Sequence, residues 1–294
     1  MGSPCEVQLY AEGRPAARRA AHLAIAEVQR LEARYSRYRP DSLLSEINRV
    51  AAAGGGMDVD EETASLLNYA DACYRQSEGL FDISSGILRR AWRFVGQGGL
   101  PDPEQIQSLL DRVGWHRLRW NPPRLEFMQP GMEIDFGGVV KEYGADRVAA
   151  LCRESGVRHG LVNLGGDIRI IGPHPDGAPW QIGIRHPRPG EILGTLPLVH
   201  GGVASSGDYE RCVVVEGVRY GHVLNPRTGW PVRRLSAVTV VGELCVVAGS
   251  ASTIAMLKEE DGSAWLAELG LPHFWVDVEG RMGGTLVFPP ESVP

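Results

Sequence analysis

The amino-acid sequence predicts an α+β fold in which a largely antiparallel sheet packs against helices. Segments with helical spacing dominate the first half of the chain, and short β-branched segments separated by turn residues dominate the second half. Such segregation of helices and strands favours an α+β fold over a parallel α/β fold. The 294 residues contain no internal repeat, low-complexity tract or long linker, so we expect one domain over residues 1–294.

Five helices are expected from apolar residues that recur on one face. Their predicted ranges are 15–35, 43–49, 61–77, 101–114 and 141–156. Asp41 or Ser42 is the expected cap of the second helix, Gly79 stops the third, and Gly156 ends the fifth. The run AAAGGG at residues 51–56 is expected to be a flexible connection.

Strands are predicted where β-branched and apolar residues lie between turn residues. These segments are residues 124–136, 159–172, 180–187, 210–225, 235–241 and 273–282. Residues 124–136 read as two strands around a Pro-Gly turn.

Composition excludes several classes of function. A net charge of −6 and a pI near 5.8 give no general attraction to nucleic acid or to an anionic membrane surface. No apolar stretch is long enough for a membrane span, and the first residues do not resemble a signal peptide. The expected location is therefore cytoplasmic for the sequence as written, or periplasmic if a leader was removed. The five cysteines have no CxxC spacing, so neither a disulfide framework nor a zinc site is indicated.

The segment DFGGVVKEYGAD, residues 135–146, is the first candidate for a binding site. Gly137 and Gly138 follow a predicted strand, and Lys141 lies where a helix begins. Glycines allow a ligand to approach the backbone, and a helix start offers free N–H groups to an anion. The segment matches neither a P-loop nor a dinucleotide-binding motif. An ordinary strand-to-helix turn explains the glycines equally well.

Other polar positions lie within predicted strands or turns. Gly165 and Gly166, followed by Asp167, interrupt a strand-like run and suggest a β-bulge. Ser206, in VASSGDYER at residues 203–211, lies in an expected turn without the GxSxG pattern of a nucleophilic serine. Tyr38 could stack on a planar ligand or lie at the edge of the core.

Seven short segments in fixed order resemble the ApbE family, the FAD:protein FMN transferases, over about residues 1–285. They are MGSP, SRYRPDSLLSEIN, GLFDISSG, DFGGVVKEYGADR, VNLGGDIRIIG, ASSGDYER and GHVLNPRTGWP. The resemblance implies a T-fold-like α+β domain that binds FAD in a cleft. It also implies a magnesium-dependent reaction that passes FMN to a Ser or Thr hydroxyl of an acceptor flavoprotein and releases AMP.

The same resemblance implies roles for individual residues. Lys141 and Thr253 are implied catalytic residues, and the Gly138 carbonyl and Thr253 are implied magnesium ligands. The residues implied to contact FAD are Met1, Tyr38, Leu80, Phe81, Asp82, Asp135, Lys141, His222 and Val223.

Two positions depart from the family pattern. Near the C-terminus the family has an aspartate that binds the metal four residues before the threonine, but this chain has Gly249 before Thr253. The family's usual Lys-Gly-Tyr is Lys-Glu-Tyr here, which places Glu142 beside Lys141. Glu142 could supply the missing carboxylate to the metal, or point to solvent from the first helical turn, where an acid is favourable.

Three functions are therefore open at the level of sequence. The first is an active FAD:protein FMN transferase. The second is a catalytically degenerate FAD-binding protein that acts as a flavin carrier or partner protein. The third is magnesium-dependent hydrolysis of FAD to FMN and AMP. Restoring the acid with Gly249→Asp is expected to raise any transferase or hydrolase activity.

Overall fold

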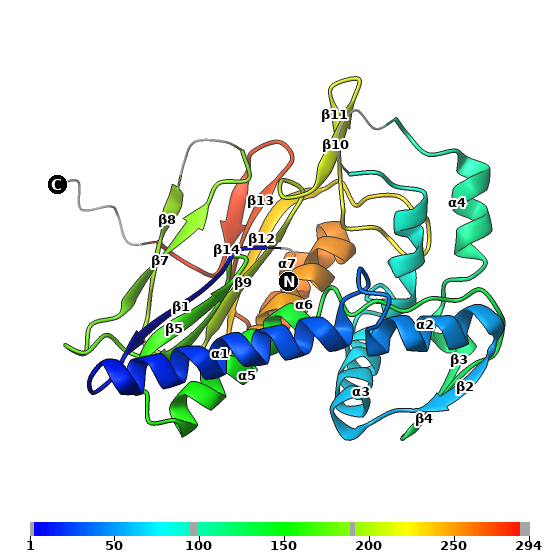
Figure 1. Cartoon of the computed structure of the whole chain (residues 1–294). Coiled ribbons are helices and arrows are strands. Elements are labelled where there is room, and N and C mark those ends of the chain that lie inside the picture. Colours follow the sequence, from blue (N-terminus) through cyan, green and yellow to red (C-terminus); the bar gives the residue numbers. More distant parts are fainter. Residues whose placement is uncertain (1–2, 95–98, 189–191, 289–294) are drawn as a thin grey trace.

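A seven-stranded antiparallel sheet forms the centre of the structure (Figure 1). The computed structural model describes residues 3–94, 99–188 and 192–288. Neighbouring strands of the sheet are antiparallel throughout, which confirms the predicted α+β class. The strands, in spatial order, are β1 (Cys5–Tyr10), β5 (His159–Leu164), β6 (Asp167–Gly172), β9 (Gly202–Gly207), β12 (Leu235–Gly242), β13 (His273–Asp277) and β14 (Met282–Gly284).

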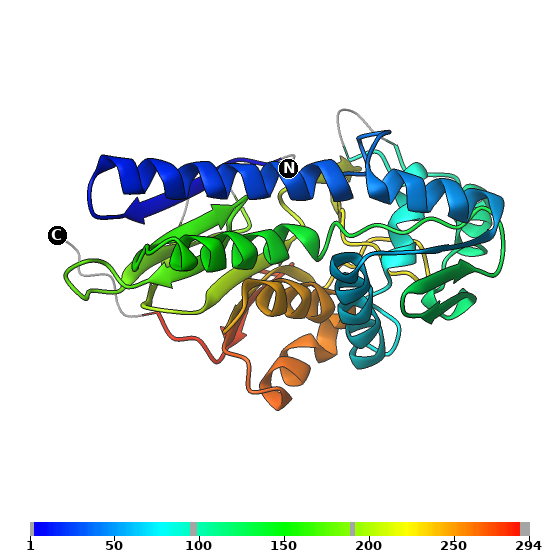
Figure 2. The same cartoon turned by 60° about the horizontal axis from the view of Figure 1, so that its bottom comes forward.

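Helices α1 (Arg14–Tyr35), α5 (Val140–Glu154) and α6 (Cys245–Lys258) cover one face of this sheet, as Figure 2 shows. The opposite face carries the hairpin of β7 (Trp180–Arg185) and β8 (Ile192–Leu198). Side chains alternate between the two faces along a strand. On β5, Val162 packs on the helical side, whereas Leu161 packs against the hairpin.

The rest of the chain forms a helical region beside one end of the sheet (Figure 1). It contains α2 (Leu43–Ala53), α3 (Glu61–Gln76), α4 (Pro103–Leu110) and the 3-10 helices η1 (Ile83–Arg90) and η2 (Trp115–Arg117). A small sheet joins β2 (Gly55–Asp58), β4 (Arg124–Phe127) and β3 (Leu118–Asn121). One continuous apolar cluster joins α2 and α3 to α6, so this region and the main sheet share a core.

The remaining elements are β10 (Cys212–Val215), β11 (Val218–Gly221), η3 (Glu259–Asp261) and α7 (Gly262–Glu268). Strands β10 and β11 form a hairpin that projects from the top of the molecule in Figure 1. In the described parts of the chain, no helix combines the length and apolar character that a membrane span requires.

The predicted helices are confirmed, with Ser42 as the cap of α2 through a bond from Ser45 N at 3.0 Å. The prediction of a flexible connection at residues 51–56 is wrong. Helix α2 continues to Ala53, because alanine favours a helix, and β2 begins at Gly55.

Three predictions about strands and turns are also wrong. Residues 132–136 are not a strand, because β4 pairs with β3 on one side and with β2 on the other. Gly165 and Gly166 are not a bulge: they make the turn between β5 and β6, and both have positive φ, 66° and 95°. Ser206, expected in a turn within residues 203–211, lies instead in the central strand β9, Gly202–Gly207.

Candidate functional site

A cavity of about 1180 Å³ opens between the sheet and the helical region. All but one of the site residues expected from the sequence line it: Tyr38, Leu80, Phe81, Asp82, Asp135, Gly138, Lys141, His222, Val223 and Thr253. The exception, Met1, lies outside the described residues. Ordinary small-molecule pockets measure roughly 300–1000 Å³, so this cavity has room for a large ligand such as a dinucleotide.

The turn at residues 135–138 is held by its own aspartate. Asp135 accepts a hydrogen bond from Gly137 N at 2.9 Å and forms an ion pair with Arg37. Gly138 lies next to the Phe81 ring: a Cβ added at Gly138 would be 3.4 Å from it. Val139, which precedes α5, makes no side-chain capping bond, and the first N–H of the helix, that of Val140, donates to the Phe136 carbonyl at 3.0 Å.

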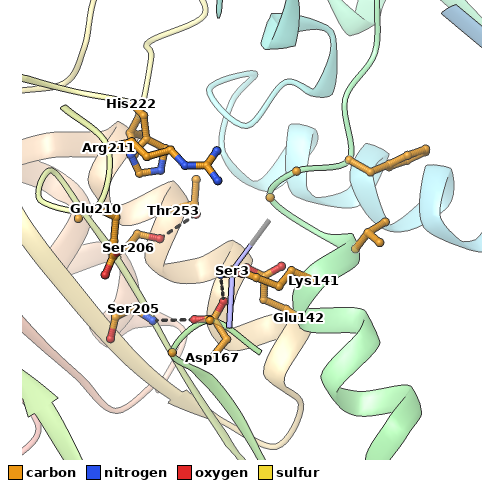
Figure 3. Close-up of a pocket in the computed structure, with 18 of the residues that line it drawn as sticks. Ser3, Lys141, Glu142, Asp167, Ser205, Ser206, Glu210, Arg211, His222 and Thr253 are labelled. Carbon is orange, nitrogen blue, oxygen red and sulfur yellow. Dashed lines mark hydrogen bonds and ion pairs between the residues drawn. The ribbon is translucent and has the colours of Figure 1, made fainter. Parts of the chain in front are cut away.

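Lys141 points into the cavity from the first turn of α5 (Figure 3). Its ammonium lies 2.5 Å from Asp167 Oδ2, and Asp167 also accepts a bond from Ser205 N at 3.3 Å. Burial opposes the charge on Lys141, but the charges of Asp167 and Glu142 outweigh this and raise its pKa above the usual range. The chain has only one other lysine, Lys258, and its other basic side chains of this kind are arginines. Position 141 therefore carries a compact ammonium where most cationic positions of the chain carry a guanidinium.

Glu142 is buried beside Lys141, with 6% of its surface exposed, so the interpretation that it points to solvent is wrong. The cause is its direction on α5: the side chain turns toward Gly249 on α6, where no side chain blocks it. Its Oε1 lies 3.8 Å from Lys141 Nζ, and its Oε2 is buried without a hydrogen-bond partner. Burial, and then the nearby charge of Asp167, raise the pKa of Glu142.

A chain of hydroxyl groups connects β9 to α6. Ser206 Oγ lies 2.9 Å from Thr253 Oγ1 and 2.8 Å from Ser252 Oγ. The bond between Ser206 and Thr253 is visible in Figure 3. Ser206 thereby orients the Thr253 hydroxyl at the cavity wall, and no base that would make Ser206 a nucleophile contacts it among the hydrogen bonds of the described residues.

His222 and Arg211 lie on the opposite wall, in the segments that flank the β10–β11 hairpin (Figure 3). His222 is exposed to solvent within the cleft, but protein atoms and the charge of Arg211 surround it. Desolvation and then Arg211 lower the pKa of His222 to about 4, so the imidazole is neutral near pH 7. Tyr38 lies at the rim, 72% exposed, with its hydroxyl accepting a bond from Arg37 at 2.8 Å.

The Asp82 carboxylate has a structural task. It accepts hydrogen bonds from Ser84 N at 2.8 Å, Ser84 Oγ at 2.6 Å and Trp115 N at 2.9 Å. These bonds fix the loop that presents Leu80 and Phe81 to the cavity.

The hairpin turn between β5 and β6 also shapes the site. A Cβ at Gly165 would lie 2.5 Å from Ser3 Oγ and 3.7 Å from Lys141 Cδ. Only glycine therefore lets the turn lie against the N-terminal segment and the lysine.

Asp167 was not expected as a site residue, and the pattern Gly-Gly-Asp after a strand was the available signal. The described residues include no group of three or more His, Cys, Asp or Glu side chains placed to hold a metal. A hard cation here would therefore need oxygens from a ligand. The oxygen donors at hand, from Glu142, Thr253 and Gly138, fit magnesium in kind.

Comparison with known proteins shows the family of this chain. The family model described as "ApbE family" matches residues 1–275. A Klebsiella pneumoniae protein named FAD:protein FMN transferase is 32% identical over 247 residues, which are 82% of this chain and 75% of that protein.

Solved structures agree with this result. The ApbE protein from Thermotoga maritima superposes with a TM-score of 0.89 at 30% identity, covering 97% of this chain and 94% of that one. The apo form of the Pseudomonas stutzeri flavinyl transferase ApbE gives 0.85 at 30% identity, with 98% and 92% covered. The chain belongs to the ApbE family.

Proposed function

We propose that this protein is an FAD:protein FMN transferase that binds FAD in the cavity and passes FMN to a Ser or Thr hydroxyl of an acceptor flavoprotein. The observation that carries the proposal is the convergence of the expected FAD contacts on one cavity of about 1180 Å³. The names of the relatives support the same activity. We also propose that residues 1–294 act as one domain, because the described parts share a core.

The proposed reaction is a displacement at the flavin-side phosphorus of FAD. The acceptor hydroxyl oxygen forms a new bond to that phosphorus, and the bond from the phosphorus to the bridging oxygen breaks. AMP leaves with the bridging oxygen, and the hydroxyl proton passes to water. Negative charge on the phosphate oxygens must be stabilised as this bond breaks.

Lys141 is the residue best placed to stabilise that charge. Its raised pKa keeps it protonated, and Asp167 holds the ammonium at the cavity wall. The dipole of α5 adds partial positive charge at the N-terminal end of the helix, where Lys141 lies. When bound, Mg²⁺ would neutralise further charge across the diphosphate.

The other site residues are proposed to position the nucleotide. Leu80, Phe81 and Asp82 form a loop for the adenosine, and the Asp82 carboxylate holds that loop in shape. Met1 and Tyr38 are assigned to the ends of the dinucleotide. We assign His222 and Val223 to the strand segment that lies against the bound nucleotide.

A single assay tests the proposal against its alternatives. Purified protein is incubated with FAD, Mg²⁺ and an acceptor flavoprotein, and both AMP and protein-bound flavin are measured. Flavin on the acceptor with equimolar AMP is the expected result. AMP with an unlabelled acceptor would indicate an FAD hydrolase. FAD retained through gel filtration without AMP would indicate a binding protein and would refute the transferase.

A further inference from the structure

Glu142 fills the space that a side chain at Gly249 would occupy. A Cβ built on Gly249 would lie 2.5 Å from Glu142 Cγ, 3.0 Å from Cδ and 3.2 Å from Oε1. Carbon atoms without a bond between them do not approach so closely. The carboxyl group of Glu142 on α5 therefore reaches the position from which a side chain at 249 on α6 would project.

Among the described residues, the Glu142 carboxyl group has no cationic partner closer than 3.8 Å, and its near neighbour Asp167 is itself an acid. The Oε2 atom is buried and unpaired, and Oε1 is 3.8 Å from an ammonium that lies much closer to Asp167, at 2.5 Å. Two buried carboxylates thus face the single ammonium of Lys141. A buried carboxylate without a partner is costly, so such a group either holds a proton or binds a cation that enters the ligand cavity.

Two other residues that line the same cavity carry oxygen atoms suited to a cation. Thr253 lies one helical turn after Gly249 on α6 and contributes its hydroxyl. The Gly138 carbonyl lines the cavity as well, and no donor within the described residues hydrogen-bonds to it. Oxygen ligands that include one carboxylate and leave room for phosphate oxygens and water are typical of Mg²⁺.

We propose that Glu142 replaces the carboxylate that Gly249 lacks and binds a divalent cation together with a diphosphate. The ligand has moved from one helix to its neighbour, and the two positions form a reciprocal pair: an acid on α5 with glycine on α6. The inference rests on the proposed function for the identity of the diphosphate, but not for the binding of the cation.

The test measures cation binding without any transfer reaction. Mn²⁺ serves as a paramagnetic substitute for Mg²⁺, and ADP supplies a diphosphate that carries no flavin. Electron paramagnetic resonance gives the free Mn²⁺ concentration in a titration with protein and ADP. We expect the wild-type protein to bind Mn²⁺ and Glu142→Gln, which keeps the side-chain shape, to bind it at least tenfold more weakly. Glu154→Gln, the same change at the exposed end of α5, should bind as the wild type does.

The reciprocal double variant Glu142→Gly/Gly249→Asp is the sharper test. It returns the acid to α6 and removes the side chain with which it would collide, so Mn²⁺ affinity should recover to within a few-fold of the wild type. Gly249→Asp alone must displace Glu142 and adds another carboxylate. We therefore revise the expectation from sequence and predict that this single variant lowers thermal stability.

Several results would overturn the proposal. They are unchanged Mn²⁺ affinity in folded Glu142→Gln, no Mn²⁺ binding by the wild type with ADP, or a folded double variant that does not bind. If Glu142→Gln does not fold, the double variant decides alone. Loss of Mn²⁺ binding in Glu142→Gln with no flavin transfer by the wild type would refute the proposed function and leave this inference standing.

Discussion

Replacing Asp146 with alanine is expected to destabilise the protein, because this side chain on α5 holds the start of α6. Asp146 accepts hydrogen bonds from Cys245 N at 3.0 Å and Val246 N at 2.9 Å, the first two residues of that helix. Its carboxylate also pairs with Arg169 Nε at 3.1 Å. The N-cap residue of α6, Leu244, makes no side-chain capping bond in the described structure. Asp146, which lies on α5, caps α6 in its place.

The magnitude follows from these contacts. Loss of a capping side chain costs about 0.5–2 kcal/mol, and leaving a buried N–H without an acceptor costs about 1–3 kcal/mol. Burial raises the pKa of Asp146, so desolvation of its charge offsets part of the favourable interaction. We therefore expect Asp146→Ala to lower the free energy of unfolding by about 2–4 kcal/mol. Asp146→Asn, which keeps one acceptor oxygen, should lower it by about half as much.

Urea unfolding followed by circular dichroism measures the effect as a shift in midpoint at unchanged slope. The control is Asp102→Ala at the start of α4, where an exposed carboxylate accepts one bond from Glu104 N at 2.9 Å. That variant should lose about 1 kcal/mol or less. Ordinary surface substitutions change the free energy of unfolding by about 0.5 kcal/mol or less. A change no larger than this for Asp146→Ala would refute the capping role of Asp146.

Three further predictions concern the cleft. Lys141→Met should weaken FAD binding about 10–100-fold in a flavin fluorescence titration, because a charge-assisted contact to phosphate is lost. The control variant Lys258→Met should bind FAD as the wild type does. Equal affinities of the two variants would contradict the role of Lys141 as a phosphate contact. Gly165→Ala should lower the midpoint of thermal unfolding more than Gly166→Ala. Both glycines have positive φ, but only a Cβ at Gly165 would lie close to another residue, Ser3. Equal shifts in the midpoint would argue against the contact between Gly165 and the N-terminal segment. The His222 imidazole should titrate near pH 4 by NMR, not near 6.5. Between those values the unfolded chain binds this proton and the folded chain does not, so the contribution of His222 to stability should rise with pH across that window. A titration near 6.5 would contradict the effect assigned to desolvation and Arg211.

Local sequence signals predicted the helices well and the strands less well. Ser42 at the start of α2 and Gly156 after α5 mark helix ends through bonds made within one or two turns. Strand β9 was missed because Ser205 and Ser206 and the flanking glycines have low strand propensity. Its place in the centre of the sheet comes from pairing with β6 and β12, which are distant in sequence. Strand pairing depends on the partner, and local propensity does not contain that information.

The candidate site shows the same division. The resemblance to the ApbE family, which rests on the order of the motifs, implied which segments line the cavity. The interaction partners of each side chain were not predictable from the motifs. Asp82 is occupied with Ser84 and Trp115, and Asp167 proves to be the partner of Lys141.

The sequence by itself determined the α+β class, most helix boundaries and the resemblance to the ApbE family, because these depend on short-range patterns and on their order. It also identified the two departures, Gly249 and Glu142, but left the direction of Glu142 open. Only the tertiary structure decided that direction: packing of α5 against α6 places the glutamate over the glycine and excludes it from solvent. The physical reason is that a side chain follows the free space and charge around it, and residues distant in sequence supply both.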